Sequence, residues 1–97
     1  MNDTATGPVA RKIAERLTQS LAPTRLAVIN DSAQHRGHMG DDGSGESHFT
    51  VDIVSPLFEG KNRVARQRLV NQALADLLAQ DIHALAIRTR TPDEDGV

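Results

Sequence analysis

Four histidines are the residues best suited to chemistry in this chain of 97 residues, which contains no cysteine. His35 and His38 stand three residues apart in a glycine-rich stretch, whereas His48 and His83 each open a short apolar run. Without thiolates of its own, the chain could bind a soft metal only through imidazole, carboxylate or a partner's sulfur. Each histidine also has an ordinary structural interpretation. His48 and His83 fit hydrogen-bonded strand ends, and the other two fit exposed loop positions with nothing to hold their rings.

A second candidate site is a cluster of four positive charges within eight residues that include no acid. These are Lys61, Arg63, Arg66 and Arg68. Arg63 and Arg66 would share one side of a helix N-terminus, where free backbone N–H groups also attract anions. Such a surface could grip the phosphate of a nucleic acid or of another ligand. It could equally pair with an acidic partner, or be the solvated start of a helix.

Composition and missing motifs exclude several functional classes. A net charge of −2 argues against a surface built entirely for nucleic acid. No apolar run approaches the roughly 20 residues of a membrane span, and the N-terminus lacks the pattern of a signal peptide. We therefore expect a cytoplasmic protein, or else a matured organelle protein, with no membrane association. Ser47, His48 and the scattered aspartates form no recognisable triad, and no phosphate-binding P-loop is present. We therefore expect that the protein is not an enzyme.

Hydrophobic periodicity and turn residues predict the elements that would position these groups. The predicted order is helix 8–20, strand 25–31, loop 32–46, strand 47–55, helix 63–80 and strand 82–89. Asn62 is a suitable N-cap for the long helix. Thr91, Pro92 and Glu94 predict a short terminal helix that starts with a capping box.

This order predicts an α+β domain of two layers, with helices on one face of a three-stranded mixed sheet. The first two strands can pair antiparallel across the loop. A crossover helix joins the second and third strands, which should therefore run parallel. We expect residues 1–8 to be a flexible N-terminal tail and residues 9–95 to form one domain. Phe49 and Phe58 bracket the central strand and should fill its core.

Five separated motifs, in order over about residues 10–92, resemble the BolA family. They are Asn30-Asp31-Ser32 followed by His35, Glu46-Ser47-His48-Phe49, Ser55-x-x-Phe58-x-Gly60, Arg66-x-Arg68-Leu69-Val70 and His83-Ala84-Leu85-Ala86-Ile87. The chain departs from the family pattern at Gln67, where the family usually has histidine between the two arginines. It also departs in the loop after His35, which is unusually rich in glycine and aspartate.

The resemblance implies a fold like that of class II KH domains and a role as an adaptor. Such adaptors bind a monothiol glutaredoxin and share a glutathione-assisted [2Fe-2S] cluster with it, in iron–sulfur cluster trafficking or iron homeostasis. His83 matches the family's cluster-ligating histidine. His35 matches the position of a second ligand, with His38 as its substitute. The partner and glutathione would supply thiolates, so we expect no cofactor in the isolated protein, with a monomer as the default.

Some bacterial members of the family are described as transcriptional regulators that bind DNA. The resemblance therefore also implies an alternative function, in which the basic start of the long helix contacts DNA. Lys61, Arg63, Arg66 and Arg68 would make that contact.

Overall fold

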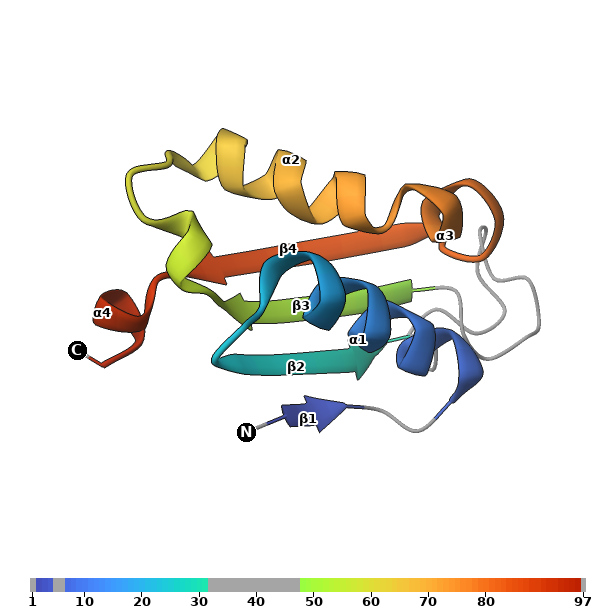
Figure 1. The fold of residues 1–97 in the computed structure, drawn as a ribbon. Helices are drawn as coiled ribbons and strands as arrows, with labels where there is room; N and C mark the ends of the chain where they lie inside the picture. Colours follow the sequence, from blue (N-terminus) through green and yellow to red (C-terminus); the bar gives the residue numbers. More distant parts are fainter. Residues whose placement is uncertain (1, 5–6, 32–47, 97) are drawn as a thin grey trace.

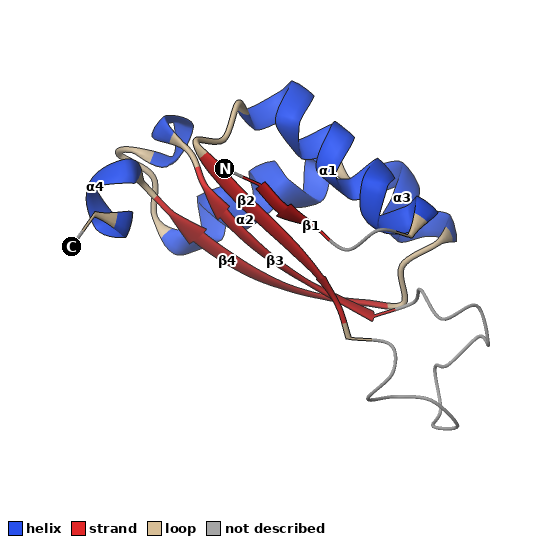
Figure 2. Cartoon of the chain, turned by 90° about the horizontal axis from the view of Figure 1, so that it is seen from below, coloured by secondary structure: helices blue, strands red, loops and turns tan. Residues whose placement is uncertain are grey.

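The computed structural model describes residues 2–4, 7–31 and 48–96, in which the helices pack on one face of a sheet (Figure 1). The elements are β1 (Asn2–Thr4), α1 (Pro8–Leu21), β2 (Arg25–Asn30), β3 (His48–Val54), the 3₁₀ turn η2 (Pro56–Phe58), α2 (Arg63–Ala73), α3 (Ala75–Gln80), β4 (Ala84–Arg90) and α4 (Pro92–Asp95). Figure 2 shows the two layers edge-on, with α1, α2 and α3 on the same side of the strands. No helix in these ranges is long and apolar enough to cross a bilayer.

The sheet contains the predicted mixed arrangement and one further strand. β2 and β3 are antiparallel and β3 and β4 are parallel, in the order β1-β2-β3-β4. The α+β prediction with helices on one face is therefore confirmed. The flexible tail predicted for residues 1–8 needs correction at Asn2–Thr4, which pairs parallel with β2, whereas Pro8 begins α1 as predicted for the first helix. Backbone groups that every residue carries hold β1 in place, so its polar side chains gave no strand signal.

The predicted long helix is divided in two at Leu74. This residue is fully buried and leaves helical geometry, with φ −108° and ψ 12°. Its N–H is shared between the carbonyl oxygens of Val70 and Asn71, at 3.1 and 3.3 Å. Sharing between these two acceptors tightens the turn toward three-residue spacing. The chain resumes as α3, since Leu78 donates its N–H to the Leu74 carbonyl at 2.9 Å.

One apolar core joins the helices to the sheet, and the central strand β3 lies within it. Phe49 and Phe58 are 2 % and 0 % exposed, which confirms their predicted place in the core. α1 contributes Ile13 and Leu17, both fully buried, on the side that faces the strands. β3 and the helix α2 that follows it are therefore fixed by burial from both layers.

Candidate functional site

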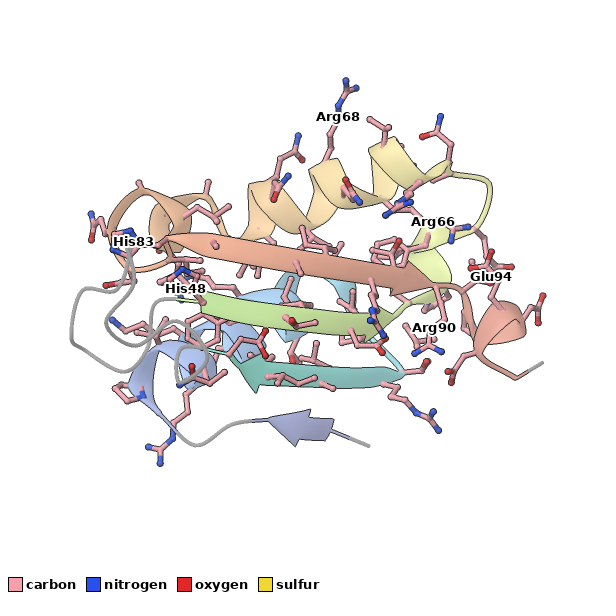
Figure 3. The ribbon with its side chains drawn as sticks, turned by 180° about the vertical axis from the view of Figure 1, so that it is seen from behind. His48, Arg66, Arg68, His83, Arg90 and Glu94 are labelled. Carbon is pink, nitrogen blue, oxygen red and sulfur yellow. The ribbon has the colours of Figure 1, made fainter. Side chains whose placement is uncertain are left out.

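The two groups of residues that the sequence singles out lie at opposite ends of the sheet (Figure 3). Because β3 and β4 are parallel, His48 pairs with Ala84 at one end and Val54 pairs with Arg90 at the other. At about 3.3 Å per residue, the length of these strands separates the two ends by roughly 20 Å. We call the first the histidine end, because it carries His48 and His83. The second end carries a groove, which we call the basic groove and which begins beside Arg90.

At the histidine end, neighbouring residues determine where His83 emerges. Ile82 is only 6 % exposed and donates its N–H to the Leu77 carbonyl at 2.9 Å, which anchors the link between α3 and β4. The next residue, His83, is exposed. Its ring stacks with that of buried His48, with centroids 6.3 Å apart and planes inclined by 19°. This end of the sheet therefore presents one imidazole to solvent against a second, buried imidazole.

A hollow of about 240 Å³ lies beside His48 at the same end. It is lined by Asp31, His48, Phe49, Ala84, Leu85 and Ala86. Asp31 donates its N–H to the His48 carbonyl at 2.7 Å, which extends the pairing of β2 and β3 by one residue. The histidine end thus combines imidazole with a small recess of largely apolar side chains.

The other two candidate ligands, His35 and His38, lie outside the described residues, and their role stays a prediction. Within the described ranges, no three side chains of His, Cys, Asp or Glu come together to hold a metal ion. His83 and His48 can therefore contribute to a metal site only together with further groups.

The opposite end carries a groove of about 540 Å³ between the start of α2 and the edge strand β4. It is lined by Lys61, Asn62, Arg63, Arg66, Ile87, Arg88, Thr89, Arg90 and Glu94. Three of the four predicted basic residues thus meet here. The fourth, Arg68, is not part of the groove lining: it is exposed further along α2 and points away from the sheet (Figure 3).

Arg88 and Arg90 are groove residues that sequence reasoning missed. A signal was available, because a crossover helix between two parallel strands begins near the carboxyl ends of both. Arginines at the end of the third predicted strand should therefore meet the start of the long helix.

The start of α2 is held by a turn, a cap and a side-chain contact. Gly60 has φ 76°, a left-handed conformation that favours glycine. Asn62 Oδ1 accepts the N–H of Ala65 at 2.9 Å, which confirms the predicted N-cap. Arg66 Nε donates to the Lys61 carbonyl at 2.8 Å, and the Arg66 side chain is only 14 % exposed. Arg66 is therefore held within the groove rather than extended into solvent.

Carboxylates neutralise part of this charge. Glu94 Oε1 and Oε2 accept from the two terminal nitrogens of Arg66 at 2.7 and 3.5 Å, and Oε1 also accepts the Thr91 N–H at 2.7 Å. The hydrogen bond from Arg66, and next that from Thr91, hold the pKa of Glu94 below its usual value. Arg90 pairs with Asp52 at 2.7 Å and Asp95 at 3.3 Å, and its hydrogen bond to Asp52 raises its pKa.

Three cations of the groove stay uncompensated. Lys61, Arg63 and Arg88 line it, and none of them forms an ion pair with another described residue. This excess is local, because the whole chain has a net charge of −2. The groove can therefore attract an anion despite the acidic balance of the protein.

Comparison with known proteins places these features in a family. Residues 17–94 match the family model described as BolA-like protein. A Vibrio cholerae protein named DNA-binding transcriptional regulator BolA is 50 % identical over 82 residues, covering 84 % of this chain and 74 % of that protein. BolA-like protein 1 of Pongo abelii is 46 % identical, and the match covers 95 % of this chain but 64 % of the relative.

A solved structure agrees at the level of the fold. The BolA domain of SufE1 from Arabidopsis thaliana matches with a TM-score of 0.82 and 41 % identity, covering 93 % of this chain and 99 % of that domain. The residues matched by the family model include β3, α2 and β4, which carry the two ends described above. The chain belongs to the BolA-like family.

Proposed function

We propose that this protein is an adaptor that docks on a monothiol glutaredoxin carrying glutathione and shares a [2Fe-2S] cluster with it. Its role would lie in iron–sulfur cluster trafficking or iron homeostasis. The observation that carries the proposal is the exposed imidazole of His83, held at the end of the sheet in a BolA-like chain without cysteine. The glutaredoxin partnership itself comes from the family resemblance.

The donor set of the chain fits a shared site better than a resident one. Imidazole can replace thiolate on one iron of a [2Fe-2S] cluster, and when bound the cluster supplies an iron position for a nitrogen ligand and one-electron chemistry. The chain contains no cysteine, so partner and glutathione must bring the thiolates. His83 would be one nitrogen ligand, and His35 or His38 the second.

The surroundings of His83 suit a ligand that must be presented to a partner. Buried Ile82 fixes the backbone immediately before it, and the stacked ring of His48 supports one side of its imidazole. The recess beside His48 offers apolar surface on which a partner could pack. Restricting a ligand before binding lowers the entropy that must be lost on association.

The test is a titration of cluster-loaded monothiol glutaredoxin, followed by visible absorption and circular dichroism. Wild type should reshape the spectrum at one-to-one stoichiometry, and His83→Ala should not. Arg68→Ala is the matched control, because Arg68 is also exposed but lies on α2, outside both ends described above. If His83→Ala reshapes the spectrum as wild type does, His83 is not a ligand. Calorimetry with apo-glutaredoxin would detect a working complex that contains no cluster.

A second candidate function is DNA binding at the basic groove. Two observations favour it: the uncompensated cations Lys61, Arg63 and Arg88, and the printed name of the Vibrio cholerae relative. Affinity for DNA should fall steeply with salt, because phosphate contacts release counterions. Arg63→Ala and Arg66→Ala should weaken binding, whereas His83→Ala should leave it unchanged. DNA binding that both Arg63→Ala and Arg66→Ala leave unchanged would exclude the groove as the DNA contact.

A further inference from the structure

Glu94 shows that the basic groove already binds an oxyanion, one that belongs to the chain itself. Its carboxylate faces the terminal nitrogens of Arg66, at 2.7 and 3.5 Å. The guanidinium is oriented for this contact by the bond from its Nε to the Lys61 carbonyl at 2.8 Å. Figure 3 shows Glu94 and Arg66 meeting at the same end of β4 as Arg90.

This internal carboxylate supplies less charge than the groove can accept. It neutralises Arg66, while Lys61, Arg63 and Arg88 line the same groove without ion pairs to described residues. A second monovalent carboxylate would have to compete with a tethered one, which has the advantage of a high effective concentration. An anion that carries several charges gains from all of these cations at once.

We propose that the groove binds a phosphate-bearing ligand, and that Glu94 is a built-in competitor which this ligand displaces from Arg66. Phosphate matches the guanidinium fork in the same bidentate manner as a carboxylate and carries more charge. The volume of about 540 Å³ lies within the usual range for small-molecule sites, and is large enough for a pyrophosphate group with neighbouring atoms. The proposal goes beyond the adaptor function, since it concerns the end of the sheet opposite to His83.

α4 suits the role of a displaceable competitor. It is a helix of four residues, and Glu94 is 49 % exposed in its side chain, so the carboxylate can leave Arg66 without opening the core. Thr91 continues to hold the start of the helix, because its side chain accepts the Glu94 N–H at 3.2 Å. Displacement therefore requires movement of a side chain rather than loss of the element.

The experiment is calorimetric titration with inorganic pyrophosphate at low salt. It uses variants that remove a negative charge and variants that remove a positive charge. Glu94→Gln removes the competing charge, yet its amide oxygen can still accept the Thr91 N–H and so keep the helix cap. Removing a surface charge pair of this type should raise affinity about two- to fivefold. Asp93→Asn is the matched control: it removes the same charge from α4 at an exposed residue that is not part of the groove lining.

The cationic side of the proposal has its own pair of variants. Arg63→Ala and Arg88→Ala should each weaken pyrophosphate binding at least severalfold, whereas Arg68→Ala on the same helix as Arg63 should leave it unchanged. A parallel titration with single-stranded oligonucleotide distinguishes the source of the phosphate. Binding of pyrophosphate points to a small phosphorylated molecule, and binding of the oligonucleotide alone, with the same dependence on Arg63 and Arg88, points to phosphodiester.

Three results would overturn the proposal. One is the absence of saturable binding to either probe. Another is an equal loss of binding in Arg68→Ala and Arg63→Ala, which would indicate attraction by overall charge. The third is identical affinity in Glu94→Gln and Asp93→Asn, which would remove Glu94 as a specific competitor. None of these results bears on the His83 titration, so the adaptor function and the groove stand or fall separately.

Discussion

Ser55 links α1 to the turn that leads into the groove helix, and replacing it with alanine should destabilise the fold markedly. Its side chain is fully buried. The hydroxyl donates to the Leu21 carbonyl in the last turn of α1 at 2.6 Å and accepts the Leu57 N–H at 3.1 Å. The hydroxyl thus hydrogen-bonds a carbonyl at the end of α1 and an N–H at the start of η2. Helix ends leave such groups without partners inside the helix.

The magnitude follows from what Ser55→Ala leaves behind. A buried polar group without a partner costs about 1–3 kcal/mol, and loss of a capping side chain costs about 1 kcal/mol. We therefore expect the free energy of unfolding to fall by about 2–3 kcal/mol, a large share of the roughly 5–15 kcal/mol of a typical domain. At about 4–8 °C per kcal/mol for a domain of this size, Tm should fall by about 10–20 °C.

Urea unfolding followed by circular dichroism, together with a thermal melt, measures this change. The matched control is Ser20→Ala, which makes the same substitution at an exposed position of α1 next to Leu21. Because alanine favours helix more than serine does, the control should change stability by no more than about 0.5 kcal/mol. A loss below about 1 kcal/mol for Ser55→Ala would refute the reasoning, since the two groups would then have found other partners.

Three further predictions concern the same region. Gly60→Ala should lower the free energy of unfolding in urea by about 1 kcal/mol, because its φ of 76° is unfavourable for alanine although nothing lies within 4 Å of the added Cβ. No loss of stability would mean that the turn readily changes conformation. Phe58→Ala, at a fully buried site, should lower the free energy of unfolding by about 3–5 kcal/mol. Leu57→Ala, at a 49 % exposed site, should lower it by less than about 1 kcal/mol. Similar losses in the two variants would contradict the placement of Phe58 in the core. Since the Arg66 contact lowers the pKa of Glu94, its stabilisation is present above the ordinary glutamate pKa of about 4.3 and is lost as pH falls through the lowered value. The urea midpoints of wild type and Glu94→Gln should therefore converge below about pH 4, and a difference unchanged down to pH 3 would exclude this linkage.

The sequence predicts well those parts of the fold that depend on local pattern. Apolar spacing located α1 and the strands β2, β3 and β4 to within one or two residues, and Asn62 and Thr91 marked the starts of α2 and α4. The order of elements also predicted both pairings, since a loop joins the antiparallel pair β2 and β3 and a crossover helix joins the parallel pair β3 and β4.

What the sequence did not reveal depends on contacts between distant residues. Nothing local distinguishes Leu74 from its neighbours, yet it divides the long helix. The pairing of β1 uses backbone groups alone. In the groove, Arg63 and Arg66 were predicted as a cluster at a helix start. The sequence did not show that Glu94 neutralises the charge of Arg66 or that Arg88 adds a further positive charge, because both lie 22 or more positions away in the chain.

The candidate site shows the same division. The family motif pointed to His83 as a ligand, and the structure adds its exposure and its stacking on His48, a residue 35 positions earlier in the sequence. That contact requires parallel strands in register, which no motif around either histidine encodes. Whether His35 or His38 completes the ligand set stays a prediction.

The adaptor function depends on nitrogen ligation by His83, and electron–nuclear double resonance tests this most directly. The mixed complex would be prepared from unlabelled monothiol glutaredoxin, glutathione and this chain labelled with ¹⁵N only in its histidines, and then reduced. We predict a ¹⁵N hyperfine coupling to the cluster that is lost or reduced in His83→Ala and retained in Arg68→Ala. Absence of any ¹⁵N coupling in the wild-type complex, or a coupling that His83→Ala leaves unchanged, would contradict ligation by His83.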